Sequence, residues 1–145
     1  HWVDFKKAIN EFERILKPDG KFTAIWNPRN LQVSEFHMKI EKNINEIAKN
    51  IKRKSSGLSG ITSRLSELLI KSGVFNDVIF SETQYYLNFS RERYIGAWHS
   101  TNDIQAQVGE SNWKKIITMI ENETSSMNII KIPYKSRAWT AYLGD

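Results

Sequence analysis

The chain has 145 residues but no cysteine, few glycines and no long apolar run. Without cysteine it can form no disulfide bond, thiolate metal site or thiol nucleophile. No stretch of about eighteen uninterrupted apolar residues is present, so no membrane-spanning helix is predicted. The chain opens on a polar segment without the basic and apolar stretches of a signal peptide, and we expect a cytoplasmic protein.

Glycine scarcity also limits the kinds of cofactor loop that the chain can supply. Its seven glycines leave one candidate for a glycine-rich loop, between Gly57 and Gly60. That segment follows a predicted helix, whereas a dinucleotide-type loop follows a strand and precedes a helix. The sequence therefore predicts no cofactor loop of this type within the chain.

The distribution of charge favours a solvated surface over a nucleic-acid site. The formal net charge is +5. The one dense basic run, Lys49, Lys52, Arg53 and Lys54, falls at the end of a predicted helix, where cations meet the negative end of the helix dipole. Acidic residues are interleaved elsewhere, so no nucleic-acid partner is expected, although a basic binding patch stays an alternative interpretation.

The apolar pattern predicts one α/β domain over residues 1–145. With 40% hydrophobic residues, the chain can bury a single core. Asp4 and Ser90 are predicted helix N-caps, and Gly20 and Gly73 are predicted helix ends. Apolar spacings predict helices over about 5–16, 34–51, 61–72, 90–98 and 112–122, and extended segments over 21–26, 78–89, 129–134 and 137–143.

Two of the extended segments carry a prediction about the sheet. Segment 21–26 has few polar positions, which indicates an inner strand of a largely parallel sheet. Pro133 cannot donate a ladder hydrogen bond, so it marks an edge, a bulge or a break between the last two extended segments.

Three motifs stand out in the first thirty residues: 1–4 (HWVD), 11–20 (EFERILKPDG) and 24–30 (AIWNPRN). They resemble the end of the fourth strand, the next helix and turn, and the fifth strand of the class I S-adenosylmethionine-dependent methyltransferases, of the type 11-like, small-molecule kind. Four later motifs follow in the family's order: 72–75 (SGVF), 89–95 (FSRERYI), 98–101 (WHST) and 132–138 (IPYKSRA).

The resemblance implies the C-terminal half of a Rossmann-like, seven-stranded methyltransferase sheet, comprising its last strands with an antiparallel final strand. Residues 90–125 would be a helical cap on the substrate side. The family's glycine-rich loop and the acidic residues that grip the cofactor are not among these residues. We therefore expect methyl transfer to a small-molecule acceptor, a carboxylic acid being one candidate, only together with an N-terminal half, and no activity from this chain alone.

The resemblance also implies roles for individual residues. His1 and Trp2 would bind S-adenosyl-L-methionine. Asn27 and Arg29 follow a strand end, where crevices of α/β sheets form, and would face the substrate. Arg29 would hold a carboxylate with its guanidinium fork. The remaining candidates for substrate binding are Tyr94, Trp98, Ser100 and Tyr134. Of these, the three aromatic residues would form a cap over the substrate together with Trp139. His99 would be a general base or a substrate contact.

Each candidate has a structural interpretation as well. The tryptophans and Tyr94 are also typical core aromatics, Arg29 could be a solvated loop residue, and His99 lacks a visible partner. No cluster of His, Asp and Glu has metal-ligand spacing, so no metal is predicted. A non-catalytic binding module or an assembly role stays open, because an incomplete sheet would expose an apolar edge that a homodimer could cover.

Overall fold

The computed structural model describes residues 3–52 and 60–144, which divide into two compact units. The described residues of unit 1 are 3–28, 60–84 and 135–144, and those of unit 2 are 29–52 and 85–134. Each unit has its own apolar core. The predicted boundaries 1–145 and 90–125 stay predictions. Residues 53–59, which contain most of the glycine-rich candidate between Gly57 and Gly60, and the residues His1 and Trp2 lie outside the described residues.

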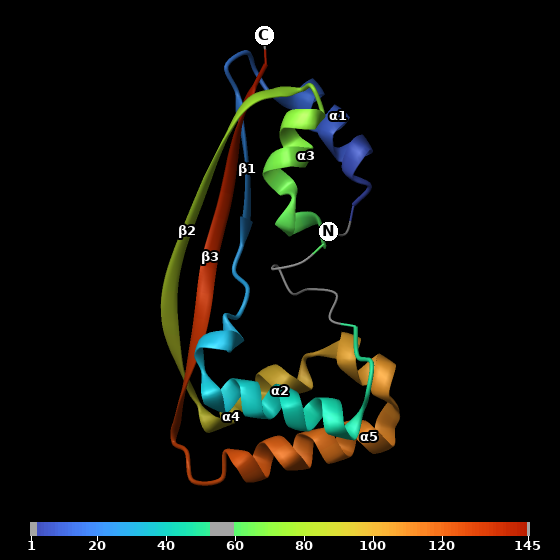
Figure 1. Ribbon diagram of the computed structural model, residues 1–145, viewed down its shortest axis with the longest axis vertical. Helices are drawn as coiled ribbons and strands as arrows, with labels where there is room; N and C mark the ends of the chain where they lie inside the picture. Colours follow the sequence, from blue (N-terminus) through green and yellow to red (C-terminus); the bar gives the residue numbers. More distant parts are fainter. Residues whose placement is uncertain (1–2, 53–59, 145) are drawn as a thin grey trace. The chain divides into compact units, whose positions relative to one another are not determined.

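Unit 1 combines two helices with the sheet (Figure 1). It contains α1 (Phe5–Ile15), β1 (Lys21–Trp26), the 3-10 helix η2 (Gly60–Ser63) and α3 (Leu65–Lys71), together with parts of β2 (Phe75–Ser90) and β3 (Ile129–Leu143). The strand order is β1-β3-β2. β1 pairs antiparallel with β3, with Lys21 opposite Tyr142 and Trp26 opposite Arg137.

The pairing of β2 fixes the directions of all three strands. A backbone hydrogen bond joins Gly144 N to Val74 O at one end, and another joins Arg91 N to Asn128 O at the other. β2 therefore runs antiparallel to β3, and β1 and β2 point the same way with the reversed last strand between them. The α/β content and the antiparallel final strand expected from sequence are confirmed.

The position of β1 within the sheet differs from the sequence prediction. Among the described strands β1 is an edge strand with an antiparallel neighbour, so an inner place in a largely parallel sheet is wrong for this part of the chain. Phe22, Ala24 and Trp26 pack on the unit 1 core, whereas Ile25 on the other face is 61% exposed. Alternating burial of a mostly apolar segment explains why sequence alone overstated its burial.

The turn between α1 and β1 uses two residues for different reasons. Asp4 Oδ1 accepts the amide of Lys7 at 2.9 Å, which confirms the predicted N-cap of α1. Asp19, not Gly20, adopts the left-handed backbone conformation, with φ of 62°. Gly20 is needed because a Cβ there would lie 2.6 Å from Lys17 O. This turn aims the chain back along the sheet, where Phe12 stacks on Phe22 at 4.5 Å.

The core of unit 1 lies between the helices and one face of the sheet, where Figure 1 shows α1 and α3 on the same side. Gly73, with φ of 75°, ends the helical turn after α3 as predicted and lets the chain enter β2. The buried members of this core are Ile9, Leu65, Leu69, Phe75, Trp139 and Ala141.

Unit 2 is built from three helices and the adjoining ends of β2 and β3. It contains the 3-10 helix η1 (Leu31–Val33), α2 (Glu35–Ile47), α4 (Arg91–His99) and α5 (Asn102–Glu123). Ser34 and Ser90 are the N-caps of α2 and α4, and each hydroxyl accepts the amide three residues on. Its buried core members are Ile40, Ile44, Phe89, Tyr94, Trp98, Ile104, Trp113, Ile116, Ile117, Ile120, Ile130 and Ile132.

Three predicted boundaries in unit 2 differ from the structure. α2 ends at Ile47 rather than near Ile51, because Asn50 turns the chain with φ of 66°, and Ile51 packs on the core from beyond the helix. α5 begins at Asn102 and kinks at Gly109, so its first half was missed. β3 continues through Pro133, whose carbonyl accepts the amide of Asn30 at 2.8 Å. No helix in the described ranges has the length and apolar character of a membrane span.

Candidate functional site

Arg29 is anchored at the point where the segment after β1 meets β3. Its backbone forms an isolated antiparallel bridge with Tyr134. The next residue is held as well, since Asn30 N donates to Pro133 O at 2.8 Å. The side chain is half-buried, and its Cζ lies 5.9 Å from the centroid of the Trp98 ring. Arg29 is therefore directed into unit 2 rather than solvated as a loop residue.

His37 lies in the first turn of α2 and is only 3% exposed. Its Nδ1 is 2.8 Å from the hydroxyl of Ser34, which also accepts the His37 amide as the helix cap. When that hydroxyl donates to Nδ1, the neutral ring carries its proton on Nε2. Within the described part of the chain, the buried Nε2 has no hydrogen-bond partner.

The protonation state of His37 follows from its surroundings. Burial, and to a smaller extent the positive charge of Arg29, together lower its pKa from 6.5 to about 4. The ring is thus neutral at physiological pH. A base with such a low pKa is weak, so the ring is suited to hydrogen bonding and orientation more than to removal of a proton.

Tyr94 and Trp98 lie one turn apart on α4 and are both buried. Their ring centroids are 6.4 Å apart, and the Tyr94 ring lies 5.9 Å from the His37 ring. Burial raises the pKa of Tyr94, an effect that the neighbouring Trp98 side chain and the charge of Arg29 partly offset. The phenol is therefore neutral and contributes an aromatic wall with a polar edge.

Tyr134 joins this group of residues through its backbone bridge with Arg29. It is half-buried and stacks on Tyr85, with ring centroids 5.5 Å apart and planes at 17°.

Glu41, one turn beyond His37 on α2, acts on Tyr94 through its charge and raises the pKa of the phenol. Glu41 also lines an open groove of about 570 Å³ along α2, with Leu31 and Met38 among the other lining residues.

We call Arg29, His37, Tyr94, Trp98 and Tyr134 the Arg29 cluster. It combines a permanent cation, a neutral imidazole with one unpaired nitrogen, and three aromatic rings. A guanidinium beside aromatic rings is the chemistry that pairs with acidic groups in proteins.

The structure thus brings together four residues predicted from sequence, Arg29, Tyr94, Trp98 and Tyr134. His37 was missed, although its place on the stripe that continues with Ile40 and Ile44 was a visible signal of a buried histidine.

The other predicted residues lie apart from this cluster. Asn27 is an exposed residue of unit 1 that follows β1. His99 is exposed in the last turn of α4, and Ser100 caps that helix by donating from Oγ to Ala97 O at 2.8 Å. Trp139 belongs to the core of unit 1. The proposed roles of these residues stay predictions.

The residues predicted to bind the cofactor, His1 and Trp2, lie outside the described residues. No described side chain is assigned to S-adenosylmethionine. In the described ranges there is also no group of three or more His, Cys, Asp or Glu residues placed to hold a metal ion.

Comparison with known proteins gives a limited likeness to solved structures, among them two methyltransferases. No family model and no curated protein matches the chain. It is similar to phosphoethanolamine N-methyltransferase 2 of Haemonchus contortus, solved with phosphomonomethylethanolamine and S-adenosylhomocysteine, at 14% identity over 100% of this chain and 31% of that chain, with a TM-score of 0.36. A protein described as a methyltransferase of Bacillus halodurans is 11% identical over 94% of this chain and 57% of that chain, with a TM-score of 0.37.

The chain thus spans 31% and 57% of the lengths of these two structures. TM-scores of this size do not establish a shared fold.

Proposed function

We propose that this chain forms the acceptor-binding part of an S-adenosylmethionine-dependent methyltransferase whose substrate is a small molecule with an acidic group. The observation that carries the proposal is the placement of Arg29. Its half-buried guanidinium follows the end of β1 and turns toward Trp98 in a largely buried cluster. The ordered sequence motifs and the reversed last strand between β1 and β2 support the same assignment.

Residues of the Arg29 cluster would bind and orient the acceptor. Arg29 would pair with the carboxylate of an acid, and His37 Nε2 would hydrogen-bond a second polar group of the same molecule. Tyr134, which is less buried than Tyr94, would border the entry. These contacts hold one acceptor oxygen in line and keep water away, which is most of what methyl transfer asks of a protein.

The cofactor would supply an electrophilic methyl group on a sulfonium. The residues of the Arg29 cluster would hold one oxygen of the acceptor carboxylate in position to receive that methyl group. A carboxylate acceptor needs no proton transfer in this step. The absence of a proton transfer fits this cluster, because its imidazole, with a pKa of about 4, is a weak base and its phenol, with a raised pKa, is a weak acid.

The assignment is tested on the protein together with every residue encoded before His1. We expect that added sequence to contain a strand ending in a glycine-rich turn. Calorimetry should then show binding of S-adenosylmethionine and S-adenosylhomocysteine, and a panel of small carboxylic acids should be scanned for release of S-adenosylhomocysteine. A preceding sequence without such a strand and turn, or a complete protein that binds neither compound, would contradict the proposal.

The role of Arg29 is tested by Arg29→Gln, with Arg93→Gln as the matched control. Arg93 is an exposed arginine of unit 2 that lies over the Phe89 ring, so its replacement removes the same charge away from the cluster. We expect Arg29→Gln to raise KM for the acid at least about tenfold, equivalent to about 1.4 kcal/mol, and to leave cofactor affinity unchanged. Equal effects of the two variants would remove Arg29 from the acceptor site.

A second candidate function, assembly, is favoured by the edge of β1. Among the described strands, β1 has a neighbour on one side alone, and Ile25 on it is 61% exposed. A second copy of the chain could cover this edge. Light scattering after gel filtration tests this: a dimer that Ile25→Lys converts to a monomer is expected, and a monomeric unaltered chain at all concentrations would contradict it.

A further inference from the structure

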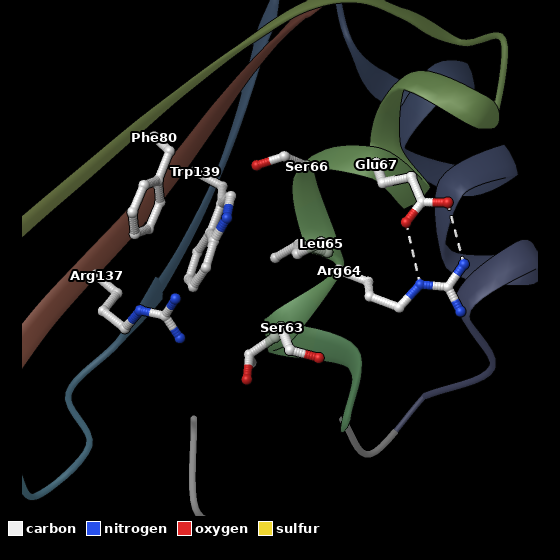
Figure 2. Close-up of a pocket in the computed structure, with 9 residues that line it drawn as sticks. Ser63, Arg64, Leu65, Ser66, Glu67, Phe80, Arg137 and Trp139 are labelled. Carbon is white, nitrogen blue, oxygen red and sulfur yellow. Dashed lines mark hydrogen bonds and ion pairs between the residues drawn. The ribbon is translucent and has the colours of Figure 1, made fainter. Parts of the chain in front are cut away.

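Unit 1 contains a pocket of about 290 Å³ that the proposed function does not use (Figure 2). One wall comes from the sheet, with Phe80 on β2 and Arg137 and Trp139 on β3. The other wall is formed by η2 and the start of α3, and its lining residues are Thr62, Ser63, Arg64, Leu65, Ser66 and Glu67. The volume is at the lower end of the range for small-molecule sites.

Arg137 is the positioned cation of this pocket. Its side chain is 15% exposed, and its Nε lies 3.0 Å from Glu82 Oε2. Its Cζ lies 4.8 Å from the Trp139 ring centroid and 5.2 Å from that of Phe80. Figure 2 shows its guanidinium extending from β3 toward the space that Ser63 borders from the other side. Stacking and ion pairing fix this guanidinium before any ligand arrives.

Positive charge exceeds negative charge among the ion pairs on both walls. On the sheet side, Lys135 and Arg137 share the single carboxylate of Glu82, at 2.7 and 3.0 Å. On the helix side, Arg64 and Lys71 share that of Glu67, at 3.0 and 2.6 Å. One carboxylate cannot neutralise two cations, so these described ion pairs carry an excess of positive charge, which favours an anion in the pocket.

The remaining lining limits what kind of anion fits. Figure 2 shows the Arg64 guanidinium turned to Glu67, so of the described cations that line the pocket Arg137 is the one that extends toward it. The Ser66 hydroxyl points to the side of Trp139 in the same view. Trp139 and Leu65 add flat and apolar surface. A carboxylate on a small apolar or aromatic body matches this combination of one planar cation, a hydroxyl and apolar walls.

We propose that this pocket binds a small organic carboxylate, with Arg137 holding the carboxylate and Trp139 contacting its apolar body. The proposal goes beyond the methyltransferase assignment and does not depend on it. It concerns residues of unit 1 alone and is tested by binding, so its failure would leave the Arg29 cluster untouched.

The test is a titration of the full 145-residue chain with benzoate, followed by ligand-observed NMR, with benzamide and inorganic phosphate as comparison probes. We expect benzoate to bind with a Kd on the order of 1 mM and benzamide at least about tenfold more weakly, because benzamide lacks the charge. Phosphate should not displace benzoate. Absence of benzoate binding up to about 10 mM, equal binding of benzamide, or displacement by phosphate would overturn the proposal.

Arg137→Gln and Lys135→Gln form a matched pair. Both remove one positive charge beside Glu82, and each leaves that carboxylate with the other cation, so no buried charge is orphaned. Only Arg137 lines the pocket. We expect Arg137→Gln to weaken benzoate binding at least about tenfold and Lys135→Gln less than about threefold. Equal weakening would mean that the general field, not the pocket, attracts the anion.

A steric variant covers the case in which Arg137→Gln does not fold, as judged by circular dichroism. Ser66→Leu adds volume to the pocket without changing charge, and it should abolish benzoate binding. Unchanged affinity in Ser66→Leu would place benzoate elsewhere and overturn the proposal.

Discussion

The positive charge of Arg29 acts on the buried imidazole of His37. Burial is the larger cause that lowers the pKa of His37 to about 4, and Arg29 is the second cause because it disfavours another positive charge nearby. Different interactions position the two residues. The backbone bridge to Tyr134 holds Arg29, and the N-cap of α2 holds His37. The effect of the Arg29 charge on the pKa of His37 therefore reports whether these two side chains lie close together in the Arg29 cluster.

We first predict that Arg29→Gln raises the pKa of His37. The variant removes a neighbouring positive charge, and protonation of the ring then becomes less costly. The pKa should stay below 6.5, because burial is the larger cause of the lowering and remains in place. NMR titration of the imidazole protons measures it, with Arg93→Gln as the control that leaves the value unchanged. A pKa that is the same in Arg29→Gln and the parent chain would show that the side chains do not interact.

Acid sensitivity of unit 2 is the second prediction. The folded-state pKa of His37 is lowered, so between pH 6.5 and about 4 the unfolded chain binds a proton that the folded chain does not. The free energy of unfolding should therefore fall as pH is lowered through this window, by about 3 kcal/mol in total from this residue, and level off below it. Above pH 6.5 the residue contributes no pH dependence.

Urea unfolding at a series of pH values measures this effect. His37→Gln should remove that part of the slope, whereas His99→Gln should retain it, because His99 is exposed. Identical pH profiles for the parent chain and His37→Gln would contradict a buried neutral histidine.

The third prediction compares the serine caps of α2 and α4. Ser34 and Ser90 both accept an amide hydrogen bond three residues on, at 3.4 and 3.3 Å, but Ser34 also bonds His37 Nδ1 at 2.8 Å. Ser90→Ala should lower the free energy of unfolding by about 1 kcal/mol. Ser34→Ala should cost about 1 kcal/mol more, because it also leaves a half-buried hydrogen bond unmade. Equal losses in urea unfolding would mean that the imidazole bond adds no stability.

Sequence could predict the features that depend on a few neighbouring residues. The N-caps Asp4 and Ser90, the helix end at Gly73 and the presence of β1 are confirmed for this reason. The edge position of β1 was not predictable, because whether a strand has one neighbour or two depends on distant segments. The first half of α5 was also missed, since its apolar positions are sparse before the glycine at its kink.

The same distinction applies to the candidate sites. Motif order singled out Arg29 and Tyr134, and the structure joins their backbones. The environment of His37 depends on the packing of α2 against α4, which no local pattern specifies. The ion pairs of Glu82 with Lys135 and Arg137 require the register of β2 on β3. Such contacts join residues far apart in the sequence, so no local pattern could predict them.

The fourth prediction concerns two helical glycines with opposite backbone requirements. Gly96 lies inside α4 with open space where a Cβ would be, so Gly96→Ala should raise the free energy of unfolding by about 0.5–1 kcal/mol. Gly109 adopts φ of 74° at the kink of α5. Gly109→Ala should therefore lower the free energy of unfolding by about 1–2 kcal/mol, because an L side chain is strained there.

Both variants add one methyl group within a helix, so helix propensity alone predicts the same sign for both. Urea unfolding of the pair therefore isolates the kink. A stabilising Gly109→Ala would mean that α5 can run straight through this position, and the packing of Ile104 and Trp113 on either side of the kink would have to change with it.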